Sequence, residues 1–461
     1  MTDLTTWLPR AVQAIERWQE QYGPFDTHPS TVVPDDRLAE AFARLSDRLT
    51  DNYPFFHPHY VGQMLKPPHP AAVLGYVTAM LVNPNNHALD GGPATAAMEK
   101  EVVARLAAMF GLPRHLGHLT SSGTIANLEA LYVARESRPG MAVAFSADAH
   151  YTHARMCRVL GIEPVSVATD ERGRMDLDAL ERSLADGGVG TVVATLGTTG
   201  LGALDPLPEI IDLARQHGAR VHVDAAYGGF FALIADDRPD GVERAPFAAI
   251  AHADSVVVDP HKHGLQPYGC GAVLFADPAV GRFYDHDSPY TYFSSDELHL
   301  GEISLECSRA GASAAALWLT LDVLPLTADG LGAVLRPGRR GALAWNELLA
   351  DSDVLSPYQA PELDIVTYLP RTDTMSTLDA ASHRLFEVAG SGDPTTQVHI
   401  ATYAVTAVQL AARGHHLETD TDRARILRSV LMKPESGDLV PDIHTRLEAL
   451  VGSGHDLRPP S

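Results

Sequence analysis

The sequence has few cysteines and no long hydrophobic run, and both shortages exclude whole classes of protein. Cys157, Cys270 and Cys307 are an odd and widely scattered set among 461 residues, so they cannot form a disulfide framework. A low cysteine content is typical of a reducing compartment. No apolar run approaches the ~18 residues of a membrane span, and residues 1–23 contain no continuous apolar core. We therefore expect a cytoplasmic protein without a signal peptide or a membrane helix.

Positive charge is scarce as well. The chain has 35 Lys and Arg residues against 58 Asp and Glu residues, which gives a formal net charge of −23. Such a chain repels phosphate backbones and anionic lipid headgroups, so we expect neither a nucleic acid nor a membrane as a partner. Hydrophobic residues make up 45% of the chain, enough for a large core, and its size favours an enzyme.

The middle third of the chain predicts an α/β fold with a mostly parallel central sheet. Short apolar, β-rich runs recur there, and helical stretches such as 176–184 and 207–216 separate most of them. This alternation is the pattern of a sheet that is covered by helices on both faces. The β-rich runs are 141–145, 164–167, 191–196, 219–223, 255–258 and 272–275.

The two ends of the chain differ from this middle part. Residues 1–50 predict amphipathic helices broken by a loop, and residues 51–75 are dense in proline, histidine and aromatic side chains. A helical pattern extends over 80–112. After Ser308 another long helix leads to a stretch with glycine and proline. We place the loop at 23–35, the Gly/Pro stretch at 329–341 and strands of a small α+β domain at 365–369 and 398–401.

Two charged residues follow predicted strands. Asp224 comes directly after the run 219–223, and Lys262 lies in a turn after the run 255–258. The carboxyl ends of parallel strands are where such sheets bind ligands. Buried charges are costly unless they are paired or used, so these two side chains either form an ion pair with each other or share a ligand.

A third element favours the ligand. Residues 119–129 pass through a Thr-Ser-Ser-Gly-Thr turn into an amphipathic helix, and a helix N-terminus of this kind binds phosphate, although it could be only an N-cap cluster. The glycine patterns of dinucleotide and nucleoside-triphosphate sites are absent. A phosphate turn, a carboxylate beside a pyridine nitrogen and a lysine that forms a Schiff base are together what pyridoxal 5'-phosphate requires.

These residues resemble the group II pyridoxal-phosphate-dependent amino acid decarboxylases, which include aromatic amino acid and tyrosine decarboxylases. The strongest matches are HVDAAYGG at 222–229 and DPHK at 259–262. The resemblance covers most of the chain and implies the type I (aspartate aminotransferase-like) fold, with a large cofactor domain and a small C-terminal α+β domain. Further matching segments lie at 57–60, 83–102, 148–156, 194–207 and 428–434.

The resemblance also assigns roles to single residues. Lys262 matches the Schiff-base lysine, Asp224 the partner of the pyridine nitrogen, and His150 the histidine that stacks on the ring and helps to hold the substrate carboxylate. The other matching positions are Ser122, Gly123 and Thr124 in the phosphate turn, Thr198 or Thr199 near the cofactor, Ala226 under the ring, and His261 beside the lysine. His153, His217, His222 and His263 are expected to be ordinary histidines, and no metal site is expected.

The chain departs from the family at two positions near the lysine. Asp259 stands where some animal members have an asparagine beside the phosphate, which puts that contact in doubt, and His263 replaces a tryptophan of the animal aromatic enzymes. In the family a loop tyrosine from the neighbouring subunit donates a proton to Cα. Here segment 283–293 offers Tyr290 and Tyr292 ahead of Tyr284 for this role.

The resemblance implies decarboxylation of an L-amino acid to an amine and carbon dioxide. Transamination, oxidative deamination and retro-aldol cleavage on the same scaffold are alternatives, as is a scaffold protein without catalysis. A transaminase would bind the substrate carboxylate through an arginine, and Arg309, Arg371 and Arg413 are available. Aromatic residues at 53–60 favour an aromatic substrate. We expect a homodimer with residues 1–80 packed on the partner, a large domain at 81–325 and a small domain at 326–461.

Overall fold

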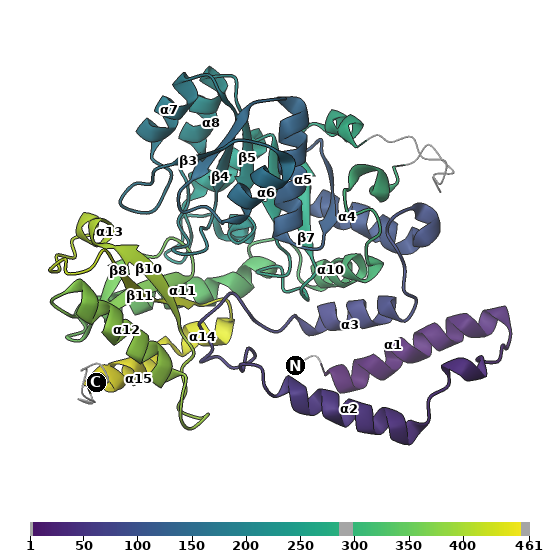
Figure 1. Ribbon diagram of the computed structural model, residues 1–461. Coiled ribbons are helices and arrows are strands. Elements are labelled where there is room, and N and C mark those ends of the chain that lie inside the picture. The colour runs from purple at the N-terminus through teal and green to yellow at the C-terminus, as the bar shows by residue number, and fades with distance from the viewer. Residues whose placement is uncertain (1–2, 285–297, 453–461) are drawn as a thin grey trace.

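The computed structural model describes residues 3–284 and 298–452, and its largest element is a mostly parallel seven-stranded sheet (Figure 1). The strand order is β1-β7-β6-β5-β4-β2-β3. Strand β7 runs antiparallel to both of its neighbours, and the other pairs are parallel. The strands are β1 Leu116–Thr120, β2 Ala142–Ser146, β3 Pro164–Val167, β4 Val189–Thr195, β5 Arg220–Asp224, β6 Ser255–Val258 and β7 Gly271–Phe275.

Helices cover both faces of this sheet because the side chains of its strands alternate between them. On β4, Val192 and Ala194 belong to the cluster that contains α7 and α8, whereas Val193 belongs to the cluster of α5 and α6. These helices are α5 Gly123–Ser137, α6 Thr152–Leu160, α7 Leu177–Ala185 and α8 Leu207–Gln216, with α4 Pro93–Met109, α9 Arg244–Ala249 and α10 Gly311–Val323 also packed around the core. The predicted α/β architecture is therefore confirmed.

Strand β1 is the element of this sheet that the sequence did not predict. Its five residues Leu116–Thr120 are all buried, and its partner β7 is more than 150 positions away along the chain. In the sequence these residues are simply those that precede the phosphate turn. They form a strand because they pair with β7. The helix predicted over 80–112 is also interrupted, because α3 Pro70–Met80 ends before it and α4 begins at Pro93.

The N-terminal helices extend away from the sheet (Figure 1). Helix α1 Leu4–Gln19 lies against α3, while α2 Asp35–Leu49 buries none of its side chains. Both helices confirm the predicted amphipathic pattern, with the loop between them. Helix α2 exposes its apolar stripe, which consists of Leu38, Phe42, Leu45 and Leu49.

A smaller antiparallel sheet with the order β10-β11-β9-β8 forms the C-terminal part. Its elements are α11 Leu331–Asp351, β8 Leu355–Gln359, β9 Ile365–Pro370, α12 Met375–Ala389, β10 Ala401–Thr406, α13 Ala407–Ala412, β11 Arg423–Val430, α14 Pro434–Asp438 and α15 Val440–Gly452. The strand expected at 398–401 is displaced to β10, and β8 and β11 were not predicted. The division at 80/81 and 325/326 stays a prediction.

The Gly/Pro stretch at 329–341, for which no element was predicted from the sequence, is largely helical. Most of it lies inside the long helix α11, which tolerates Pro337. Its glycines permit a close approach of the chain, because a Cβ on Gly338 would lie 2.2 Å from the carbonyl oxygen of Leu431. A Cβ on Gly341 would lie 2.6 Å from the Cα of Gly437 in α14. Glycine serves packing here rather than chain breaking.

Within residues 3–284 and 298–452, no helix is both long and apolar enough to cross a membrane.

Candidate functional site

A polar cavity of about 240 Å³ lies at the carboxyl ends of β4, β5 and β6. The segments that follow these strands meet there with the beginnings of α5 and α6, as expected for a parallel sheet. Its lining residues are Ser122, Gly123, Thr124, Asn127, His150, Tyr151, Thr152, Thr195, Gly197, Thr199, Asp224, Ala226, Tyr227, Asp259, His261 and Lys262. The three elements singled out in the sequence therefore share one cavity.

The ion pair considered between Asp224 and Lys262 is not the pairing that forms. The Nζ atom of Lys262 lies 3.0 Å from Oδ2 of Asp259, three positions earlier in the same turn. Asp224 instead pairs with His153, whose Nε2 atom lies 2.8 Å from Oδ2 of the carboxylate. Asp224, Asp259 and Lys262 all line the cavity, so the cavity contains two carboxylates and one lysine amine.

The Thr-Ser-Ser-Gly-Thr turn leads into a helix, as the sequence predicts. Ser122 is the N-cap of α5, and its hydroxyl oxygen accepts the backbone N–H of Ile125 at 3.3 Å. The first two N–H groups of the helix, on Gly123 and Thr124, have no acceptor among the described residues. A Cβ on Gly123 would lie 2.5 Å from Oδ2 of Asp259, so glycine allows that carboxylate to approach the helix N-terminus. Free N–H groups at a helix N-terminus are suited to bind an anion, and Asp259 lies at the edge of this position.

His150 lies at the entrance to α6 and lines the cavity. Its Nδ1 atom accepts the N–H of Thr152 at 3.3 Å, and its ring lies 4.2 Å from that of Tyr151, centroid to centroid. Burial lowers the pKa of His150, and the charge of Asp224 only partly offsets this. A neutral imidazole on the cavity wall can stack on a flat ligand and accept or donate a hydrogen bond.

Asp224 is ionised although it is buried. Burial acts to raise its pKa, but the hydrogen bond and charge of His153, the charge of Lys262 and the N–H of Ala226 outweigh it and hold the pKa well below its usual range. The Ala226 N–H lies 3.1 Å from Oδ1. His153 was expected to be an ordinary histidine; its position three residues after His150 was the available signal that it lies near the site.

The remaining predicted residues are placed as follows. Ala226 and His261 line the cavity, and Nδ1 of His261 lies 2.8 Å from the carbonyl oxygen of Cys270. Of the two threonine alternatives, Thr199 lines the cavity, whereas the hydroxyl of Thr198 accepts the N–H of Ala203 at 3.0 Å. Tyr290 and Tyr292 lie outside the described residues. Tyr284 is buried with its ring 5.4 Å from that of Tyr132.

A second buried cluster behind the cavity was missed in the sequence. His263, next to Lys262, places Nε2 at 2.9 Å from Oδ2 of Asp364, and the hydroxyl of Tyr227 donates to the other oxygen of the same carboxylate. All three residues are buried. Because Asp364 directly precedes β9, this cluster ties the lysine turn of the large sheet to the small sheet.

The three arginines considered for a transaminase are engaged elsewhere. Arg309 pairs with Glu99 at 2.5 Å, Arg371 donates to the carbonyl oxygen of Ser352, and Arg413 donates to the side chain of Gln359. None of them lines the cavity. A transaminase would need an arginine in the cavity to bind the substrate carboxylate, and none of the described lining residues is an arginine.

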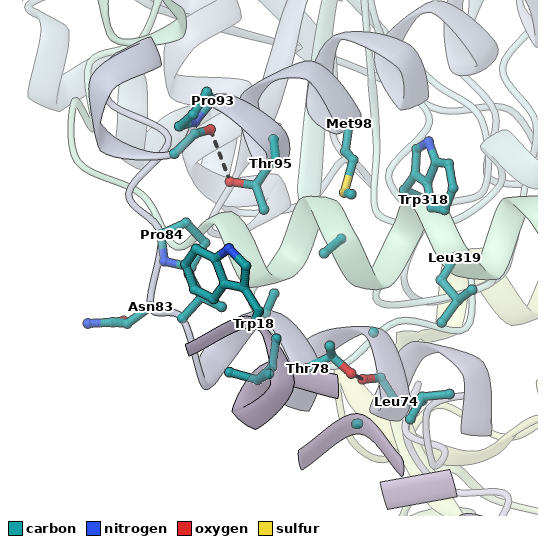
Figure 2. A pocket seen from close by; sticks show the side chains of 18 of the residues that line it. Trp18, Leu74, Thr78, Asn83, Pro84, Pro93, Thr95, Met98, Trp318 and Leu319 are labelled. Carbon is teal, nitrogen blue, oxygen red and sulfur yellow. Dashed lines mark hydrogen bonds between the residues drawn. The ribbon is translucent and has the colours of Figure 1, made fainter. Parts of the chain in front are cut away.

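Two other cavities lie apart from these residues. Tyr53, Phe55, Phe56 and Pro67 line a separate cavity of about 550 Å³, so the described structure does not bring the aromatic segment to Lys262. Another cavity, of about 620 Å³, is an apolar groove between α1, α3, α4 and α10. Figure 2 shows Trp18 on one side of this groove and Met98 and Trp318 on another. Its lining has almost no groups that could carry out acid–base chemistry.

The cavity beside Lys262 fits pyridoxal phosphate. It offers an amine for an aldehyde, an ionised carboxylate for a pyridinium, a neutral imidazole for the ring face, and two backbone N–H groups for the phosphate. The polar lining suits a ligand with several hydrogen-bonding groups.

Comparisons with known proteins agree with this fit. The sequence matches the pyridoxal-dependent decarboxylase conserved domain over residues 54–337. An L-tyrosine decarboxylase from Enterococcus faecium is 28% identical over 479 residues, covering 79% of this chain and 78% of that protein. An L-aspartate decarboxylase from Thermococcus kodakarensis is 28% identical over 338 residues, covering 71% and 84%.

A solved structure shares the fold. Tryptophan decarboxylase from Catharanthus roseus, in complex with L-tryptophan, superposes with a TM-score of 0.74. The superposition covers 93% of this chain and 91% of that chain at 19% sequence identity. At this identity the likeness concerns the fold alone, and it includes both sheets.

Proposed function

The chain belongs to the pyridoxal-dependent decarboxylase family, and from this premise we propose that Lys262, Asp224 and His150 carry its reaction. The protein is a pyridoxal-phosphate-dependent carboxy-lyase that converts an L-amino acid to an amine and carbon dioxide. The observation that carries the residue assignment is the single polar cavity in which the strand-end Asp224, the lysine turn and the N-terminus of α5 meet.

Each residue has a distinct task in this proposal. When bound, pyridoxal phosphate supplies an electron sink for the pair of electrons that carbon dioxide leaves on Cα. Lys262 binds the aldehyde, and Asp259 holds its Nζ atom in position at 3.0 Å. Asp224 keeps a negative charge at the cavity floor, where it stabilises a protonated pyridine nitrogen.

The side chains around the cavity bind and orient the other groups. Gly123 and Thr124 bind the phosphate through their free N–H groups, with Ser122 as the helix cap, and Thr199, Ala226 and His261 complete the cofactor site. His150 orients the substrate carboxylate for departure. Tyr290 or Tyr292 then returns a proton to Cα.

The substrate in this proposal is an aromatic L-amino acid rather than an acidic one. Lys262 is the one lysine or arginine among the described lining residues, and Asp224 and Asp259 make the cavity negative. The side-chain carboxylate of an acidic substrate would find repulsion there instead of a partner. The tyrosine decarboxylase of Enterococcus faecium is a relative with an aromatic substrate.

A homodimer is the assembly that the N-terminal helices support. Leu38, Phe42, Leu45 and Leu49 form an apolar stripe on α2 and are each more than half exposed. Monomeric proteins rarely leave such a stripe uncovered, and a second copy of the chain is the proposed cover. The active sites are then shared through the segment that holds Tyr290 and Tyr292.

The proposed location is the cytoplasm. The three cysteines of the chain form no disulfide, and one of them is exposed, which is typical of a protein in a reducing compartment.

Borohydride trapping and product analysis test the proposed function. Lys262→Ala should bind no cofactor that borohydride can fix to the protein, because the imine requires the lysine amine. Purified parent enzyme, screened against all common amino acids, should release carbon dioxide and an amine from an aromatic substrate. A reducible adduct on another lysine would contradict the lysine assignment, and a keto acid or aldehyde as the product would contradict decarboxylation.

A further inference from the structure

One histidine outside the predicted site contacts the proposed cofactor acid. His153 is fully buried, and its Nε2 atom lies 2.8 Å from Oδ2 of Asp224. The other carboxylate oxygen, Oδ1, accepts the N–H of Ala226. Each oxygen of Asp224 therefore has one protein donor, and the carboxylate is fixed in orientation.

His150 and His153 both lie at the start of α6. His150 precedes α6 and His153 lies in its first turn, so three positions separate them. His150 lines the cavity, whereas His153 lies behind Asp224 with its ring 5.9 Å from that of Phe145. The Nδ1 atom of His153 has no partner among the described residues. Because the ionised carboxylate of Asp224 can only accept, the proton of this contact lies on Nε2 of His153.

The other titratable groups near Asp224 cannot replace this contact. His222, two positions earlier on β5, bonds to Asn127 and Ser255, and burial lowers its pKa to about 3, so it adds no positive charge. His150 is held neutral by burial. Lys262 supplies charge, but its Nζ atom pairs with Oδ2 of Asp259 at 3.0 Å instead of with Asp224.

We propose that His153 is a positioning residue that donates its Nε2–H to Asp224 and thereby keeps this carboxylate ionised and directed into the cavity. This inference rests on the proposed function, because it takes Asp224 as the partner of the cofactor. His153 does not line the cavity. It acts on the reaction through the charge and orientation of Asp224.

The experiment compares His153→Phe, which cannot donate, with His153→Gln, which keeps an N–H donor. Apoenzyme is titrated with pyridoxal phosphate, and the absorption of the bound cofactor is recorded against pH. Losing a hydrogen bond to a charged group should weaken cofactor binding by about 10- to 100-fold in the Phe variant. It should also move the pH at which the absorption band changes and lower kcat more than it raises KM. The Gln variant should recover most of both readouts.

Two controls separate this role from packing. His217→Gln changes an exposed histidine and should leave every readout unchanged. In an Asp224→Asn background, His153→Phe should have little further effect, because the partner that it positions has lost its charge. If the Phe variant unfolds, His153→Leu, which also lacks a donor, takes its place in this cycle.

The outcomes separate this inference from the proposed function. Parent enzyme that binds no borohydride-reducible cofactor would overturn the proposed function itself. Parent enzyme that binds normally, together with a folded Phe variant whose affinity and absorption match those of the parent, would overturn the role of His153 alone. Equal losses in the Phe and Gln variants would also overturn it, because they would indicate packing instead of hydrogen bonding.

Discussion

Asp259 and Lys262 determine the electrostatics at the phosphate end of the candidate site. Asp259 approaches the N-terminus of α5 because residue 123 is glycine, and it holds Lys262 in an ion pair. One oxygen of Asp259, Oδ1, is buried without a partner among the described residues. A negative charge at the edge of an anion site opposes the phosphate of the cofactor, so this residue limits affinity in the proposed arrangement.

We expect Asp259→Asn to tighten the binding of pyridoxal phosphate to apoenzyme by about tenfold, because it removes a like charge a few ångströms from the phosphate. Fluorescence titration of the apoenzyme measures the change. Pyridoxal, which lacks the phosphate, is the control and should gain less, since only the release of Lys262 favours its binding. Weaker binding of pyridoxal phosphate in the variant would contradict the placement of the phosphate at α5.

Two helices are important at the scale of single elements: α2 for the proposed dimer, and α11 for the close packing of the C-terminal part. Helix α2 exposes an apolar stripe at positions 38, 42, 45 and 49, a spacing that places these side chains on one helix face. Helix α11 contacts α14 through glycines, which lets the two helices approach more closely than side chains allow.

Phe42→Glu should weaken the proposed dimer, because it places a charge in the middle of the apolar stripe. Losing a central apolar contact costs about 2 kcal/mol, equivalent to a dissociation constant about 30-fold higher. Sedimentation velocity across a concentration series measures it. Glu40→Lys, a charge change away from the stripe on the same helix, is the control and should leave the dimer intact. A parent protein that sediments as an active monomer would contradict the dimer.

Gly338→Ala should destabilise the protein by about 2 kcal/mol, the usual cost of overpacking. The added Cβ would lie 2.2 Å from the Leu431 carbonyl oxygen, and neither backbone can easily move away. Urea unfolding measures the loss. Gly188→Ala is the matched control, because a Cβ there meets nothing within 4 Å and its cost should be small. Equal stabilities of the two variants would contradict the close packing of α11.

At the scale of the whole molecule, buried histidines make the fold sensitive to acid. Burial lowers the pKa values of His222, His261 and His263, that of His222 to about 3. All three surround the cavity or the strands beneath it. Since the unfolded chain binds protons at these positions near pH 6.5 and the native chain does not, falling pH favours unfolding.

These histidines should therefore lower the free energy of unfolding as the pH drops below 6.5. Each such histidine contributes a slope of up to about 1.4 kcal/mol per pH unit until its native pKa is reached. Urea unfolding between pH 4 and pH 8 measures the slope. His222→Gln cannot be protonated at this position and should show a shallower slope. An unchanged slope would contradict the assignment to His222.

The proposal that the active sites are shared concerns the whole assembly. Mixing Lys262→Ala with a Tyr290→Phe/Tyr292→Phe double variant should restore part of the activity, because a hybrid dimer has one site with both an intact lysine and an intact loop. Turnover of the mixture is compared with that of each variant alone. No recovery despite proven subunit exchange would contradict the shared loop but not the dimer.

The sequence by itself determined the large sheet and the chemistry at its strand ends. Strands that are buried on both faces are apolar along their whole length, so the strands of the middle third were recognisable in the sequence. Asp224 and Lys262 were found because they follow such strands. The N-terminus of α5 was equally local, since a helix cap needs only neighbouring residues.

Tertiary structure decided which of these groups contact each other. Lys262 pairs with Asp259 and Asp224 with His153, and the two pairings depend on how the turn after β6 and the start of α6 lie in space. Strand β1 exists because a distant strand pairs with it. Likewise, the glycines of α11 form a helix because α14 packs against them. Local pattern fixes what an element can be, but contacts between distant segments add the free energy that selects one arrangement.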